Sequence, residues 1–360
     1  MRRPWPDTGA ARRADLAACR ATLRAGSRSF FAASYLLPRG VREPASAVYA
    51  FCRVADDAID LGGGDEAIAR LHERLDRVYA GRPLPVPADR ALAGVVASHA
   101  IPRALPEALL EGLAWDAAGR RYEDLADLYA YAARVAGAVG AMMTVLMGAR
   151  APEIVARACD LGIAMQLSNI ARDVGEDARA GRLYLPLQWL REAGVEPEAW
   201  LARPVLSSEV GAVVQRLLGV ADGLYARADA GIARLPRACR PGIGAARLLY
   251  AEIGREVARA GFDSISRRAT VPAWRKAGLL ARSLAAAPAR GGHAPPLTET
   301  RFLVEAVAAA SPQVAPSKPR RPARSQPGLG AQVTWLVELF DRLERRKNRL
   351  AAAMPGEFKG

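Results

Sequence analysis

Apolar side chains recur at intervals of three and four positions along most of the chain, from about residue 14 to residue 284. This spacing puts them on one face of an α-helix, and no stretch shows the alternation of two that is typical of a half-buried strand. Clusters of Gly and Pro, such as residues 81–87 and 194–197, interrupt the pattern and mark turns between helices. The pattern therefore predicts an all-α protein without a sheet.

The helical pattern predicts one domain over residues 15–285, preceded by a flexible N-terminus at residues 1–14. Residues 286–330 change to Ala, Pro, Arg and Ser, which is typical of a linker, although 298–310 carries the pattern of a short helix. Residues 331–360 predict a basic amphipathic helix and tail. This helix either docks on the body of the protein or attaches to a membrane surface.

The composition supports a large packed core, because 51% of the 360 residues are apolar. The net charge of +14 attracts polyanions, namely nucleic acid, anionic lipid headgroups or phosphorylated small molecules. We expect no nucleic acid as a partner, because no basic groove with interleaved aromatic residues is visible. The basic tail leaves nucleic-acid binding as a remaining alternative, since residues 311–360 hold ten Lys and Arg against four Asp and Glu.

Cysteine and histidine are too few and too scattered for a disulfide framework or a zinc site. The first twenty residues have basic side chains but no apolar segment behind them, so no secretory signal is predicted. The longest uncharged run, residues 135–149, is shorter than the ~20 residues that span a bilayer. We expect a cytoplasmic protein, with peripheral contact on the inner face of the membrane as an open alternative.

Two groups of acidic residues stand at helical spacing within apolar helices. Asp56 and Asp60 are four residues apart, so they lie one turn apart on one helix face. Asn169, Asp173 and Asp177 repeat this spacing on a second helix. Stacked carboxylates repel each other unless a cation binds between them. Ligands that are all oxygen atoms favour Mg²⁺, with Mn²⁺ as the alternative cation.

Arginines lie beside both acidic groups, where they are suited to bind phosphate: Arg53, Arg172 and Arg182. Magnesium held by a few carboxylates usually completes its shell with water and substrate phosphate. The residues therefore indicate metal-dependent handling of a diphosphate. We expect no nicotinamide cofactor, because Gly242-Ile-Gly-Ala-Ala-Arg247 lacks the third glycine and the preceding strand of a dinucleotide motif.

Four segments resemble the squalene/phytoene synthase family in order and spacing: residues 27–38, 49–60, 166–186 and 247–257. The resemblance covers roughly residues 15–285, and it is strongest to the bacterial members that form phytoene. It implies a single-domain isoprenoid synthase fold with a central cavity between two Asp-rich helices.

The resemblance also implies roles for individual residues. The expected Mg²⁺ ligands are Asp56, Asp60, Asn169, Asp173 and Asp177. The four aspartates are expected to be catalytic together with Phe30 and Tyr131, which would line the reaction centre. The residues expected to bind or orient substrate are Ser27, Ser29, Tyr49, Arg53, Gln166, Asn169, Arg172, Arg182, Tyr184, Tyr250 and Arg267.

The implied activity is that of a prenyltransferase in carotenoid biosynthesis. Two molecules of geranylgeranyl diphosphate would condense head to head to phytoene through cyclopropyl prephytoene diphosphate. The small side chains of Ser34 and Ser46 are expected to face the cavity, which favours C20 tails. One alternative is a relative that uses farnesyl diphosphate and makes presqualene diphosphate, hydroxysqualene or dehydrosqualene. Another is a non-catalytic assembly or binding protein on the same fold. The oligomeric state is left open.

Overall fold

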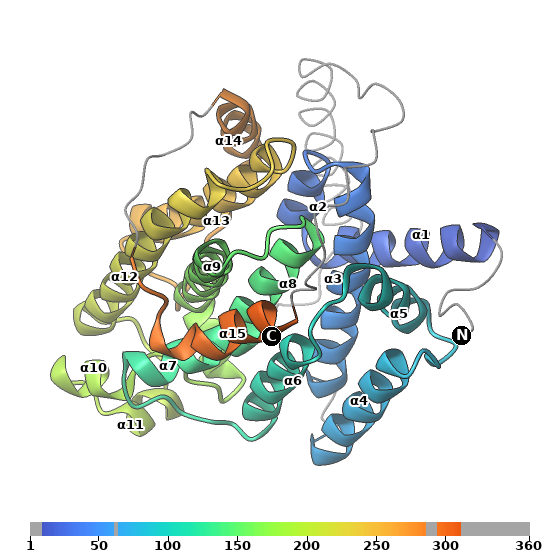
Figure 1. Ribbon diagram of the computed structural model, residues 1–360. Coiled ribbons are helices and arrows are strands. Elements are labelled where there is room, and N and C mark those ends of the chain that lie inside the picture. The colour runs from blue at the N-terminus through green and yellow to red at the C-terminus, as the bar shows by residue number, and fades with distance from the viewer. Residues whose placement is uncertain (1–8, 61–63, 286–293, 311–360) are drawn as a thin grey trace, which may run out of the picture.

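The computed structural model describes residues 9–60, 64–285 and 294–310, and within these ranges it contains helices and no strand (Figure 1). This confirms the predicted all-α class. The helices, including one π-helix (η1) and one 3₁₀ turn (η2), are α1 (Gly9–Gly26), α2 (Arg28–Ser34), α3 (Arg39–Asp60), α4 (Gly64–Tyr79), α5 (Pro87–His99), α6 (Ala104–Ala117), α7 (Leu125–Ala132), η1 (Ala133–Gly137), α8 (Ala138–Leu146), α9 (Pro152–Arg179), α10 (Leu187–Glu192), α11 (Pro197–Ala202), α12 (Ser208–Ile232), α13 (Arg240–Arg259), α14 (Ala273–Ala285), η2 (Thr298–Thr300) and α15 (Arg301–Ala309).

Helix α9 lies in the middle of the bundle, with α12 and α13 on one side and α8 on the other (Figure 1). More than half of its side chains are buried, so its apolar positions surround it rather than forming a single stripe. Helix α3 packs against α1, α5 and α6. The two helices predicted to carry the acidic groups therefore differ in most of their neighbours, although α8 packs against both.

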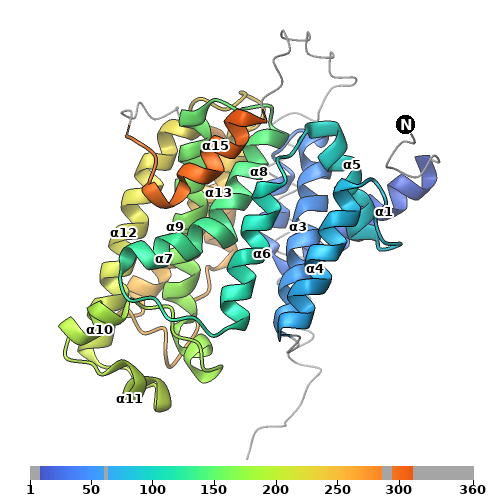
Figure 2. The ribbon, with the colours of Figure 1, turned by 60° about the horizontal axis from the view of Figure 1, so that its bottom comes forward.

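The ends of the chain differ in part from the predicted boundaries. Helix α1 begins at Gly9, so the last six residues of the expected flexible N-terminus are helical. The pattern at residues 298–310 corresponds to η2 and α15. Helix α15 packs against α6, α8 and α9, and η2 contacts α7 and η1 (Figure 2). The buried guanidinium of Arg157 donates to the carbonyls of Ala294 and Pro295 at 2.7 and 3.1 Å, which ties this segment to α9. The rest of the predicted linker and the tail at residues 331–360 lie outside the described residues.

Helices α7, η1 and α8 follow one another without a break from Leu125 to Leu146. This stretch is long and apolar enough to cross a membrane, but 56% of its most apolar window is buried inside the bundle. Its burial explains the apolar composition, since a helix in the core of a large protein needs no polar face.

Two glycines allow this stretch to approach α9 closely. A Cβ atom added to Gly162 would lie 2.3 Å from the carbonyl oxygen of Ala136, and one added to Gly140 would lie 2.3 Å from that of Ala158. Both contacts are with backbone, which cannot rotate away as a side chain can. The helix packing around the centre of the bundle therefore depends on the absence of side chains at these positions.

We predict that Gly162→Ala lowers the free energy of unfolding by about 1–3 kcal/mol, the usual cost of overpacking a core. Gly223→Ala is the matched control, because Gly223 lies on the exposed side of α12 with nothing within 4 Å of an added Cβ. It should raise the free energy of unfolding by about 0.5–1 kcal/mol, since alanine is the better helix former. Urea unfolding measures both, and equal effects at the two positions would contradict the close approach.

Candidate active site

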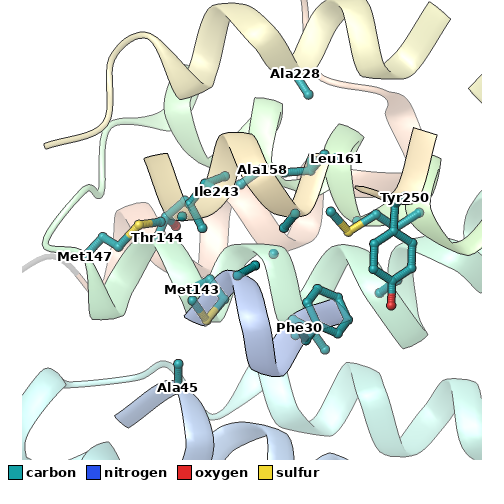
Figure 3. Close-up of a pocket in the computed structure, with 18 of the residues that line it drawn as sticks. Phe30, Ala45, Met143, Thr144, Met147, Ala158, Leu161, Ala228, Ile243 and Tyr250 are labelled. Carbon is teal, nitrogen blue, oxygen red and sulfur yellow. The ribbon is translucent and has the colours of Figure 1, made fainter. Parts of the chain in front are cut away.

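An apolar cavity of about 310 Å³ lies between α2, α3, η1, α8, α9, α12 and α13. Phe30 and Tyr250 lie close together at one end of it, and Thr144 and Met147 lie at the other (Figure 3). Both Ile154 and Asn169 of α9 line the cavity, which therefore follows that helix for about 22 Å at 1.5 Å per residue. The cavity is long, narrow and suited to an extended apolar chain.

Aromatic side chains gather at one end of the cavity. The ring of Phe30 lies 4.8 Å from that of Tyr250 and 6.5 Å from that of Tyr49, measured between centroids. Ser27 caps α2, because its Oγ accepts a hydrogen bond from the Phe30 N–H at 3.2 Å, and this cap fixes the start of the helix that carries Phe30. Ser29, also predicted to bind substrate, is a partly exposed residue of α2. Burial raises the pKa of Tyr250 to about 12, so its hydroxyl stays protonated at neutral pH.

On α3 the acidic group is paired with arginine. The Arg53 guanidinium lies 3.1 Å from an oxygen of Asp56 and 2.5 Å from an oxygen of Asp57. All three side chains are between 42% and 47% exposed, so this end of the helix faces solvent as well as the site. Asp60 is the last residue of α3, and its side chain lies outside the described part of the chain.

On α9 the predicted residues continue from the cavity towards the acidic group. Gln166 and Asn169 line the cavity, and Asp173 follows one turn later with its side chain 16% exposed. The guanidinium groups of Arg172 and Arg268 each lie within 2.7 Å of Asp173. Burial alone would raise the pKa of Asp173, but the hydrogen bonds from these two arginines hold it below its usual range.

The charged form of the Asp177 carboxyl group is disfavoured. Burial first, and then the charge of Asp173, raise the pKa of Asp177 to about 7, although Arg182 acts in the opposite direction. Among the described residues, no group of three or more His, Cys, Asp or Glu side chains is gathered closely enough to hold a metal ion. The donors that α3 and α9 do present are nevertheless all oxygen atoms. A divalent cation would relieve the repulsion at Asp177, so these residues fit Mg²⁺.

Tyr131 and Arg267 do not lie where they were expected. Tyr131 is buried outside the cavity lining, because its hydroxyl donates to Asp116 at 2.8 Å. The Tyr184 hydroxyl donates to the other oxygen of the same carboxylate at 2.7 Å. Arg267 is exposed and donates to the Ala260 carbonyl at 3.3 Å, whereas its neighbour Arg268 contacts the α9 carboxylates.

Of the two serines expected to face the cavity, only one lines it. Ser34 lines the cavity, and its hydroxyl donates to the Phe31 carbonyl at 2.7 Å. Ser46 is buried but is not among the lining residues, because it faces its own helix and donates to the Arg42 carbonyl at 2.9 Å. Ala45, one position earlier on α3, lines the cavity instead. Only the expectation for Ser34 agrees with the structure.

Sequence reasoning missed Asp116 and Arg268. Asp116 has no acidic partner at helical spacing, so nothing in its segment distinguishes it from a solvated residue. Arg268 adjoins the predicted Arg267 in a loop, where no periodicity says which of two neighbours points to the site. The only sequence signal for Arg268 was its position next to the predicted Arg267.

Comparisons with known proteins agree with this geometry. The squalene/phytoene synthase family model matches residues 23–275. The chain is 55% identical to the phytoene synthase of Cereibacter sphaeroides over 318 residues, which are 83% of this chain and 90% of that protein. It is 54% identical to the phytoene synthase of Rhodobacter capsulatus, over 82% of this chain and 90% of that protein.

Solved structures show the same fold. A dehydrosqualene synthase in complex with ligand superposes with a TM-score of 0.70 at 31% identity, covering 76% of this chain and 96% of that one. A squalene synthase from Alicyclobacillus acidocaldarius gives a TM-score of 0.63 at 26% identity, covering 71% and 97%. Because the matched family segment contains both acidic helices and every wall of the cavity, the chain belongs to the squalene/phytoene synthase family.

Proposed function

We propose that this enzyme condenses two molecules of geranylgeranyl diphosphate to phytoene, as a prenyltransferase of carotenoid biosynthesis. The proposal rests on one observation. A long apolar cavity ends beside two helices that carry carboxylates, and arginines lie next to these carboxylates. High identity to bacterial phytoene synthases over most of both chains supports it. Both acidic groups are complete in the sequence, which disfavours a non-catalytic protein on the same fold.

The polar end of the cavity is suited to bind the diphosphates. Arg53, Arg172 and Arg268 present guanidinium groups there, and the neutral hydroxyl of Tyr250 is an additional donor. Magnesium, when bound, would neutralise charge on the leaving diphosphate. The residues that would hold it are Asp56, Asp60, Asn169, Asp173 and Asp177.

The apolar part of the cavity is suited to protect the carbocations that form when diphosphate leaves. Its walls exclude water, and the ring faces of Phe30 and Tyr250 offer electron density to a cation. Cys52 lines the cavity, but burial raises the pKa of its thiol to about 12, so it does not remove protons. No His lines the cavity among the described residues, which leaves the released diphosphate as the base.

The cavity is long enough to hold a C20 tail. Four isoprene units have sixteen main-chain carbons and extend to roughly 19 Å, whereas three units extend to roughly 14 Å, from carbon–carbon bonds of about 1.5 Å. The lining along α9 extends about 22 Å, enough for the longer tail. Use of farnesyl diphosphate is the second candidate, because a solved dehydrosqualene synthase shares the fold.

We also propose a cytoplasmic location with peripheral contact at the inner face of the membrane. The reason is chemical, since both the substrate tails and the hydrocarbon product partition into lipid.

We predict that the purified protein forms a C40 triene from geranylgeranyl diphosphate with Mg²⁺ and without a nicotinamide cofactor. Chelation of the metal, Asp56→Asn and Asp173→Asn should each lower the rate at least about 100-fold, because leaving-group charge is then left unneutralised. Extracted lipids are read by mass spectrometry. Asp222→Asn, on the exposed side of α12, is the matched control and should be as active as the wild type. A C30 product formed only from farnesyl diphosphate would overturn the proposed substrate.

We predict that Ser34→Phe shifts the substrate preference towards farnesyl diphosphate, because the added phenyl group would occupy part of the cavity and shorten it. The measured quantity is the ratio of kcat/KM for the two substrates, which should change by at least about 10-fold. Ser34→Ala removes the hydroxyl without adding bulk and should leave the ratio unchanged. If the phenylalanine variant keeps the wild-type ratio, Ser34 does not determine chain length.

A further inference from the structure

One charged side chain lines the apolar cavity. Within the part of the chain that the structure describes, Arg157 is the only Asp, Glu, Lys or Arg among the lining residues. It lies on α9, three residues after Ile154 and twelve before Asn169, and its side chain is 6% exposed. The carboxylates of α9 follow Asn169, so Arg157 lies in the opposite half of the cavity. The proposed binding of diphosphate uses no charge in that half.

The guanidinium of Arg157 is bound by groups that do not line the cavity. Its Nη1 and Nη2 atoms donate to the carbonyls of Ala294 and Pro295, at 2.7 and 3.1 Å. Its Nε atom lies 2.8 Å from a carboxylate oxygen of Asp160, which is fully buried. None of these three partners is a lining residue. The charged head of Arg157 therefore points away from the cavity, and the aliphatic stem of the side chain faces it.

The stem of Arg157 has no room to move towards α12. A Cβ atom added to Gly231 would lie 2.3 Å from the Cβ of Arg157 and 3.0 Å from its Cγ. Gly231 also lines the cavity, as do Ala228 and Ile232 of the same helix. Because its head is anchored and its stem is packed, Arg157 is a fixed part of the cavity wall where α9 meets α12.

A second arginine strengthens this anchor without lining the cavity. Arg227 of α12 donates to Asp160 at 2.9 Å and to the carbonyl of Pro295 at 2.7 Å, and it is not a lining residue. The segment that provides the carbonyls lies beyond residue 275, where the match to the family model ends. The anchor of Arg157 thus depends in part on a segment outside the matched one.

We propose that Arg157 is a specificity-determining residue, whose stem limits the cavity to tails no longer than C20. Helix α9 rises about 18 Å between Asn169 and Arg157, close to the roughly 19 Å of an extended C20 tail. A C25 tail extends to roughly 24 Å, from carbon–carbon bonds of about 1.5 Å, and its last isoprene unit would meet the fixed stem. The inference rests on the proposed function, because it sets the upper limit on the substrate of that reaction.

The test compares Arg157→Ala with Arg157→Met in the full-length protein with Mg²⁺, using the C20 and C25 allylic diphosphates. Both variants lose the charged head, but only alanine removes the stem. Asp160 keeps Arg227 as its partner in both, so neither variant leaves an unpaired carboxylate. We expect Arg157→Ala to raise the ratio of kcat/KM for the C25 over the C20 substrate at least about 10-fold. Arg157→Met and Arg227→Met should change this ratio less than about 3-fold, because the volume at the wall is conserved.

Arg157→Val is the second variant, for the case that the alanine substitution prevents folding. It also shortens the stem and should raise the ratio at least about 5-fold. Equal rises in Arg157→Ala and Arg157→Met would show that the anchored charge, and not the stem, sets the limit, and would overturn the inference. An unchanged ratio in a folded variant with a shortened stem would do the same.

The wild type separates this inference from the proposed function. A wild type that uses the C20 and C25 substrates equally well keeps the proposed function and overturns the inference, because its cavity has no such limit. A wild type that consumes only the C15 substrate contradicts the proposed substrate and this limit together. A folded wild type that consumes no allylic diphosphate contradicts the proposed function as well as the inference.

Discussion

Burial of carboxylate groups beside an apolar cavity destabilises their charged forms, and the surrounding arginines and helix packing must offset this effect. Helix α9 carries Asp173 and Asp177, and burial first, then the charge of Asp173, raise the pKa of Asp177 to about 7. Arginines balance part of the charge, with Arg53 on α3 and the pair Arg172 and Arg268 around Asp173. One packed core holds both helices, and α8 packs against each of them. The site is therefore pre-arranged for cations and for the anions that accompany them.

The same fold separates two incompatible requirements of the chemistry. Ionisation of a diphosphate needs a polar, charged environment, whereas the carbocation that results must not meet water. Arg172 and Asp173 act electrostatically on Tyr250 at the aromatic end of the cavity, and the lining beyond that end is mostly apolar, with Arg157 as the charged exception. Close packing at Gly140 and Gly162 brings the walls near each other, which makes the cavity narrow.

Local periodicity was sufficient to predict the helical class and to place the acidic residues on two core helices. A spacing of four puts Asp173 and Asp177 on one face of α9 whatever packs around it. Features that depend on contacts between distant segments were not predictable in this way. Asp116 acquires its partners from α7 and from the loop after α9, and Arg268 differs from Arg267 only in the direction that a loop gives it. The prediction for Ser46 was wrong because successive side chains on a helix point about 100° apart, so a shift of one position changes which side chain faces the cavity.

Titration calorimetry of inorganic diphosphate with the full-length protein, with and without Mg²⁺, tests whether the cation links the carboxylates to the diphosphate. If the carboxylates of α3 and α9 hold cations that in turn hold the diphosphate, each ligand must strengthen the binding of the other. We predict at least about 10-fold tighter diphosphate binding with Mg²⁺ and loss of that gain in Asp173→Asn. Equal affinity in the presence of Mg²⁺ and of a chelator would contradict it.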